Sequence, residues 1–148
     1  MQERNTVKKF KVYVSHKLSG AELAFIQSME DLIRGLEEKA IEVLRYASVN
    51  GKPPPGVNVY AHDMNCIYDC DLVLAICNHA SIGIGMELER AYNLGRRVHP
   101  CTLGKHVVSP IVQHSLDHHG YKIKVAEYTD VSQIIKDVEL IRDSMREF

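Results

Sequence analysis

The feature that most constrains this chain is an uninterrupted apolar run from Leu72 to Cys77. The run has the length of a β-strand and lacks the polar alternation of a strand with one face in water. Such a run is typical of a strand that other elements cover on both faces, as in a parallel sheet. It therefore predicts a buried central strand.

The segment after this run has the composition of a turn followed by a helix. Its small and polar residues are Asn78, Ser81, Gly83 and Gly85. Apolar residues then recur at helical spacing from Met86 to Leu94, and Gly95 is placed to end a helix. We therefore expect Glu87 in the first helical turn. Ligands of open α/β sheets bind beyond the carboxyl ends of the strands, so this turn is a candidate site.

The rest of the chain alternates between strand and helix patterns. Strands are predicted at Phe10–Ser15, Ile41–Ala47, Arg97–Cys101 and Lys122–Tyr128, and helices at Ala21–Lys39, His62–Asp69, Ser109–Leu116 and from Asp130 onwards. This alternation predicts a doubly wound, five-stranded parallel sheet of the flavodoxin or Rossmann type, in a three-layer α/β/α arrangement. The proline-rich stretch Asn50–Gly56 is expected to be a loop, and Met1–Lys9 a polar lead.

Length and charge narrow the possible functions. The chain has 148 residues, so we expect one domain spanning 1–148. Its net charge of -1 argues against binding to nucleic acid or to a membrane surface. No stretch has the length and apolarity of a signal peptide or a membrane span, which suggests the cytoplasm. The four cysteines lie singly in the sequence, so reduced thiols are expected.

Several kinds of chemistry find little support in the motifs. Neither a GxGxxG turn after the first strand nor a GxxxxGK[ST] loop is present. His114, His118 and His119 lie in a segment where polar residues are normal, and no zinc-binding spacing supports a metal site there. Cys77 is the cysteine nearest the candidate site, but its apolar surroundings indicate packing. We therefore expect neither a metal nor an organic cofactor.

The acidic residues around the central strand offer a different chemistry. Asp63 and Asp71 precede the strand and Glu87 follows it. Two carboxylates that face a sugar carbon can cleave a glycosidic bond, one acting at C1 and the other handling the proton. A helix N-terminus would favour the ionised form of Glu87. The structural alternatives are a helix-end charge for Glu87 and a residue that pins the strand for Asp71.

Two segments together resemble a known family. The run DMNCIYDCDLVLA, followed by SIGIGMELERAYNLGRRV, and the earlier segment VYVSHKLSG are similar to sequences of the nucleoside 2-deoxyribosyltransferase superfamily. Within it, the chain most resembles the 2'-deoxynucleoside 5'-monophosphate N-glycosidases. The resemblance implies that Glu87 is the nucleophile at C1', that Tyr13 orients its carboxylate, and that Asp63 engages the departing base.

The resemblance also implies residues that bind substrate. The position six residues before the glutamate is an Asp in transferases that act on free nucleosides and a Ser in the monophosphate hydrolases, and here it is Ser81. The hydrolases take a second serine from the neighbouring subunit, which implies a homodimer in which Ser109 reaches the other site. The further substrate-binding candidates are Lys17, Ser19, Gly83, Gly85 and His16.

The chain departs from the family pattern after the first strand. His16 stands where a glycine is usual, and Ser19 stands where an arginine is usual. Lys17 is the residue that could replace the missing positive charge. His16 is either a contact to substrate or a packed loop residue, and the sequence favours the packed loop residue.

Taken with the resemblance, the sequence predicts hydrolysis of the N-glycosidic bond of a (2'-deoxy)nucleoside 5'-monophosphate. The products would be the free base and (deoxy)ribose 5-phosphate. Two alternatives remain at this stage. One is a nucleoside 2-deoxyribosyltransferase that passes the sugar to a second base, and the other is a non-catalytic nucleotide-binding sensor.

Overall fold

The computed structural model describes residues 8–48, 52–121 and 125–146. Strands and helices alternate along the chain, as the sequence predicts. The strands are β1 (Lys11–Ser15), β2 (Glu42–Leu44), β3 (Leu72–Ile76), β4 (Arg97–Leu103) and β5 (Ala126–Tyr128). The helices are α1 (Leu23–Glu38), α2 (Val59–Asp69), α3 (Ile82–Asn93), α4 (Pro110–His118) and α5 (Val131–Arg146).

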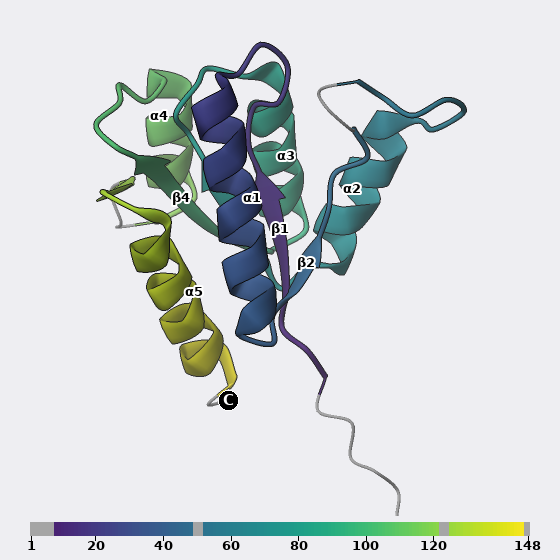
Figure 1. Ribbon diagram of the computed structural model, residues 1–148. Helices are drawn as coiled ribbons and strands as arrows, with labels where there is room; N and C mark the ends of the chain where they lie inside the picture. The colour runs from purple at the N-terminus through teal and green to yellow at the C-terminus, as the bar shows by residue number, and fades with distance from the viewer. Residues whose placement is uncertain (1–7, 49–51, 122–124, 147–148) are drawn as a thin grey trace, which may run out of the picture.

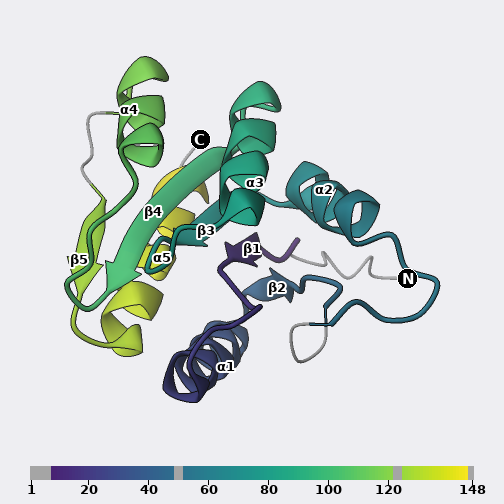
Figure 2. The same ribbon diagram turned by 90° about the horizontal axis from the view of Figure 1, so that it is seen from above.

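The strands form one parallel sheet in the order β2-β1-β3-β4-β5, so the strand predicted to be central lies in the middle. Helices α1 and α5 cover one face and helices α2, α3 and α4 cover the other (Figures 1 and 2). The predicted doubly wound three-layer α/β/α fold is therefore confirmed. The order is that of the flavodoxin-like sheets.

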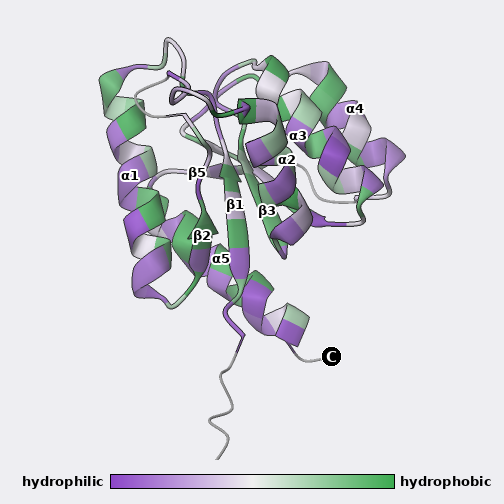
Figure 3. Ribbon diagram, turned by 90° about the vertical axis from the view of Figure 1, so that its right-hand side faces the viewer, coloured by the Kyte–Doolittle hydropathy of each residue, from purple (hydrophilic) through white to green (hydrophobic). Residues whose placement is uncertain are grey.

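Each face of the sheet carries its own apolar core. Val12, Val14 and Leu74 point towards α1 and α5, whereas Tyr13 and Val73 point towards α2 and α3. All five residues of β3 are buried, which is the reason for its unbroken apolar sequence. In Figure 3 the strands β1 and β3 are mostly hydrophobic, and the helices around them mix both kinds of residue.

Local capping explains where several elements begin and end. The Asn58 side chain accepts a hydrogen bond from Ala61 N–H, so α2 begins earlier than predicted. Asp130 accepts one from Gln133 N–H at the start of α5, as expected for a cap. Gly95 has a φ of 68° just after α3, which confirms that it ends this helix.

The helix that carries Glu87 differs from the prediction. Helix α3 begins at Ile82, because the Ser81 hydroxyl caps it by accepting a hydrogen bond from Ile84 N–H at 3.5 Å. Gly83 and Gly85 therefore lie inside the helix and do not form a turn before it. The first turn contains no acidic residue, so the prediction that Glu87 lies in the first turn was wrong.

One further predicted strand is present but shorter than predicted, and parts of three other predicted segments lie outside the described residues. β2 covers only three residues of the predicted Ile41–Ala47 strand. Residues 122–124 of the predicted fifth strand, residues 50–51 of the proline-rich loop and residues 1–7 of the lead lie outside the described ranges. All four cysteines are free. Among the described helices, none combines the length and the apolarity that crossing a membrane requires.

Candidate active site

The candidate site lies at the carboxyl ends of β1 and β3, which are neighbours in the sheet. From β1 the chain passes into α1 on one face, and from β3 it passes into α3 on the other face (Figure 2). The two loops diverge at this point, and α/β proteins of this topology bind ligands where such loops diverge. Residues of β1, α2 and α3 meet there.

Glu87 is the central acidic residue of the site. It lies on the second turn of α3 and is only 9% exposed. Its Oε2 atom is buried and has no hydrogen-bond partner within the described part of the chain. Burial raises the pKa of Glu87 to about 7, although the hydroxyls of Tyr13 and Ser15 lower it in part. Burial is thus the largest effect on the ionisation of Glu87.

Tyr13 lies beside this carboxyl group. Its side chain is 1% exposed, and burial together with the charges of Glu87 and Asp63 holds the pKa of its phenol far above the usual value. The phenol therefore stays protonated and can donate to a carboxylate. This position suits the orienting role that the resemblance implies for Tyr13.

Ser15 is a residue of the site that the sequence analysis missed. It lies two positions after Tyr13 on β1, so the two side chains point to the same face of the sheet. Ser15 is 1% exposed, its hydroxyl has no hydrogen-bond partner of good geometry in the described residues, and it lowers the pKa of Glu87. The strand alternation was the signal that could have found it.

Asp63 is held rigidly on α2. Its Oδ1 atom accepts hydrogen bonds from Ala47 N–H at 3.1 Å and from His62 Nδ1 at 3.0 Å. The negative charge of Asp63 raises the pKa values of both Tyr13 and Glu87, so the three side chains share one electrostatic environment. The structure thus brings together the three residues for which the resemblance implies catalytic roles.

Ser81 and Glu87 lie on either side of Gly83. A Cβ atom placed on Gly83 would lie 3.6 Å from Glu87 Oε1 and also 3.6 Å from Ser81 Oγ. Residues four apart on a helix share a face, which explains why Glu87 reaches back over Gly83. Because Gly83 has no side chain, the space between the carboxyl and the hydroxyl stays open. Gly85 faces away from both, since a Cβ there would meet nothing within 4 Å.

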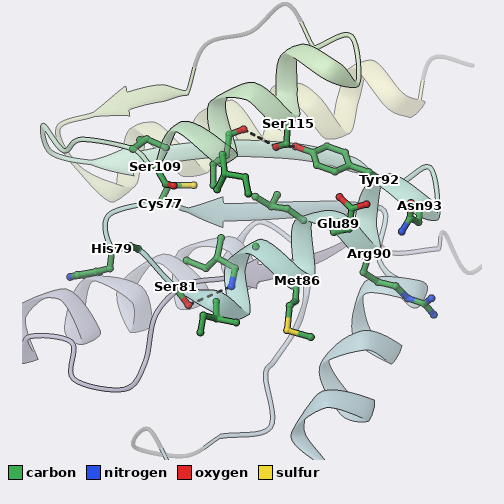
Figure 4. A pocket seen from close by; sticks show the side chains of 18 of the residues that line it. Cys77, His79, Ser81, Met86, Glu89, Arg90, Tyr92, Asn93, Ser109 and Ser115 are labelled. Carbon is green, nitrogen blue, oxygen red and sulfur yellow. Dashed lines mark hydrogen bonds between the residues drawn. The ribbon is translucent and has the colours of Figure 1, made fainter.

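Ser81 also borders a groove of about 900 Å³ between α3 and α4. Ser109 lies across this groove at the start of α4, and Met86 and Tyr92 line it further along (Figure 4). The Ser109 side chain makes no capping hydrogen bond to its own helix. Glu87, Tyr13 and Asp63 are not among the residues that line this groove.

The loop after β1 places its candidates differently. Lys17 lies near His79, and its charge helps to lower the pKa of that histidine, after the larger effect of burial. Ser19 is exposed. His16 is buried, donates from Nδ1 to the Lys17 carbonyl at 3.1 Å, and packs edge-on against Phe25 and Tyr46. This geometry agrees with the interpretation of His16 as a packed loop residue.

The contacts of the remaining candidate residues indicate structural roles. Asp71 Oδ2 accepts a hydrogen bond from Lys11 N–H at 2.9 Å, so it pins β1 as the structural alternative proposed. Burial raises the pKa of Cys77 to about 11, which leaves its thiol protonated. His119 stacks on Tyr92 with ring centroids 4.1 Å apart. In residues 8–48, 52–121 and 125–146 no group of three His, Cys, Asp or Glu residues could hold a metal ion.

The fold and the site together define a flavodoxin-like α/β protein with a buried carboxyl group at the switch point of its sheet. Among solved structures, the chain is similar to the CMP N-glycosidase BcmB of Clostridium botulinum, with a TM-score of 0.62 and 19% sequence identity. The similarity covers 87% of this chain and 98% of BcmB. It confirms at the level of the fold the resemblance noted from the sequence. No family model and no curated protein matches the chain.

Proposed function

We propose that the protein is a nucleotide N-glycosidase that hydrolyses (2'-deoxy)nucleoside 5'-monophosphates with Glu87 as the nucleophile. The observation that carries the proposal is the grouping of Glu87, Tyr13 and Asp63 in one electrostatic environment, with the Glu87 carboxyl and the Ser81 hydroxyl both beside Gly83. The shared fold with a CMP N-glycosidase supports the same reaction class.

The reaction would follow two steps that suit these residues. The Glu87 carboxylate attacks C1' of the sugar, the bond from C1' to the base breaks, and the base leaves as the neutral species with a proton taken up from solvent. Water then hydrolyses the glycosyl ester, which returns a proton to solvent, regenerates the Glu87 carboxylate and releases the sugar phosphate. Tyr13 would orient the carboxylate. Asp63 would contact the base through Oδ2, which accepts no hydrogen bond from the described residues, whereas Oδ1 is already engaged.

Ser81 supports a substrate that carries a phosphate, and Lys17, on the loop after β1, is a candidate for a further contact to that phosphate. A serine hydroxyl donates a hydrogen bond to a phosphate oxygen, whereas an aspartate in its place would repel the anion. We expect Ser81→Asp to raise the KM for a nucleoside monophosphate by at least about tenfold, because repulsion between the aspartate and the phosphate weakens binding by about 1.4 kcal/mol or more. The KM for a free nucleoside, which carries no phosphate, should stay the same. Equal losses with both substrates would contradict the role of Ser81.

We further propose that a second copy of the chain covers the groove between α3 and α4. Apolar side chains are exposed along it, among them Ile82 at 85% and Ile111 at 77%. Exposed apolar surface of this kind marks interaction sites. The partner's Ser109 would then contribute to the site, as in the resembled hydrolases. The free cysteines fit a reducing compartment, and we place the enzyme in the cytoplasm.

Release of base from a panel of ribo- and deoxynucleoside monophosphates tests the proposal. Incubation with and without an acceptor base separates hydrolysis from transfer. We expect free base and sugar phosphate in both samples, and Glu87→Ala should abolish the release while nucleotide still binds. A new nucleotide formed with the acceptor would favour a transferase. No release from the unmutated protein with any nucleotide would favour a sensor.

A further inference from the structure

His62 lies beside the candidate active site and has no part in the reaction as proposed. It directly precedes Asp63 on α2, and its Nδ1 atom lies 3.0 Å from Asp63 Oδ1. The His62 side chain is 40% exposed, whereas that of Asp63 is 14% exposed. A mostly buried carboxylate is therefore hydrogen-bonded to a ring that reaches the solvent.

The contact between these two side chains does not follow from the helix itself. Successive residues of a helix point about 100° apart, so their side chains do not face each other. The His62 ring has to turn towards its neighbour for Nδ1 to reach Oδ1, and this ordering of a half-exposed side chain has an entropic cost. The hydrogen bond to the carboxylate offsets that cost.

The hydrogen atom on Nδ1 belongs to the bond with Asp63. A carboxylate has only acceptors, so His62 Nδ1–H donates and Asp63 Oδ1 accepts. The other polar neighbour of Nδ1 is the Cys66 thiol, whose sulfur lies 3.9 Å away. Burial, together with the negative charge of Asp63, raises the pKa of Cys66 to about 11, so this thiol stays protonated. The thiol donates to the Arg45 carbonyl at 3.8 Å and leaves Nδ1 to the carboxylate.

The two oxygens of Asp63 have different surroundings. Oδ1 accepts from His62 and also from Ala47 N–H at 3.1 Å. Two donors on one oxygen fix the rotation of the carboxylate, so Oδ2 keeps a single direction. In residues 8–48, 52–121 and 125–146, no donor is bonded to Oδ2. The charge of Asp63 raises the pKa values of Glu87 and Tyr13, so this carboxylate lies close to both residues.

We propose that His62 is a positioning residue, which acts through Asp63 on the departing base. Its N–H turns Asp63 Oδ2 towards the base, where the carboxylate accepts a hydrogen bond from a ring nitrogen that has taken up a proton from solvent. When the bond from C1' to the base breaks, the electron pair passes to the base, which keeps this proton and leaves neutral. Asp63 is a carboxylate before and after the step. The inference rests on the proposed function and deepens it.

Two substrates with different leaving groups test this inference. One is a nucleoside monophosphate that the protein cleaves, and the other is the 4-nitrophenyl glycoside of the same sugar 5-phosphate, whose nitrophenolate leaves without a proton. We expect His62→Gln to lower kcat for the nucleotide at least about tenfold, because a hydrogen bond to a charged group is lost. The kcat for the nitrophenyl substrate should stay nearly unchanged.

His62→Asn is the matched control variant. The amide N–H of asparagine takes the place of Nδ1, whereas the longer glutamine side chain carries its amide to the position of Nε2. His62→Asn should therefore keep most of the activity with both substrates. Because the His62 side chain is 40% exposed, we expect both variants to fold, and thermal unfolding checks this.

Three results would overturn the inference. They are an unchanged kcat of His62→Gln for the nucleotide, a parallel loss with the nitrophenyl substrate, and a His62→Asn protein as impaired as His62→Gln. A parallel loss would mean that the change disturbs Glu87, which acts on both substrates. If the unmutated protein cleaved neither substrate, the proposed function would fail and this inference with it. Cleavage without the effect of His62 would refute the inference alone.

Discussion

The proposed role of Glu87 and its buried surroundings favour opposite protonation states of its carboxyl group. Nucleophilic attack requires its carboxylate, but its burial among β1 and α2 favours the neutral acid and raises its pKa to about 7. A phosphorylated substrate would bring further negative charge near the site. The donors on Tyr13 and Ser15 are the groups that stabilise the ionised form.

The pH dependence of base release follows from this pKa. The protonated acid cannot attack C1', so kcat/KM should rise with pH and level off above about pH 7. Initial rates measured at low substrate from about pH 5.5 to 8.5 would give the profile. A flat profile, or a rate that falls over this range, would contradict the assignment of Glu87 as the nucleophile.

The same pKa predicts an effect on stability. Folding raises the pKa of Glu87 from 4.5 to about 7, so the folded state binds the proton more tightly. This contribution is full below about pH 4.5 and is lost as the pH rises through about 7. Glu87→Gln should therefore stabilise the protein at pH 8 by up to about 3 kcal/mol, and much less at pH 5. Urea unfolding of both proteins at the two pH values gives the difference. An equal difference at both values would contradict the burial effect.

At the scale of the element, the two glycines of α3 should differ. A methyl group on Gly83 would contact Glu87 Oε1 and Ser81 Oγ at 3.6 Å, which is ordinary contact, so the fold accepts it. Alanine at either position should stabilise the helix by about 1 kcal/mol. Gly83→Ala would fill the space for the sugar, and we expect kcat/KM to fall at least about tenfold, since misplaced substrate loses this much or more. In Gly85→Ala, kcat/KM should fall far less. Similar losses in both variants, measured by base release, would contradict the geometry.

The elements themselves were largely predictable. The unbroken apolar run predicted that β3 lies in the middle of the sheet, because a strand covered on both faces has no polar alternation. The start of α3 was missed because glycines usually mark turns, whereas the Ser81 cap starts the helix despite the cost of Gly83 and Gly85 inside it. A glycine pattern alone does not distinguish these two cases.

The site was predictable only in part. Asp63 and Glu87 were candidates as acidic residues around the central strand, whereas Tyr13 and the role of each residue came from the resemblance. Strand alternation could have added Ser15. The raised pKa of Glu87 could not be predicted, because it depends on burial by elements that are distant in the sequence.

At the scale of the whole molecule, the dimer can be tested at its proposed interface. Ile111 is 77% exposed on α4, beside the groove. A lysine there would place a charge inside an apolar interface, so Ile111→Lys should give a monomer with at least about tenfold lower activity, because the partner's serine is lost. Light scattering coupled to gel filtration gives the mass. A dimeric Ile111→Lys protein, or a fully active monomer, would contradict the shared site.

The most direct test of the central claim is to trap the glycosyl-enzyme. The unmutated protein would be mixed with a nucleotide that it cleaves, quenched in acid and digested, and the peptides would be mapped by mass spectrometry. We predict a sugar phosphate attached to the α3 peptide at Glu87. Base release with the adduct on another residue would contradict the proposed role of Glu87.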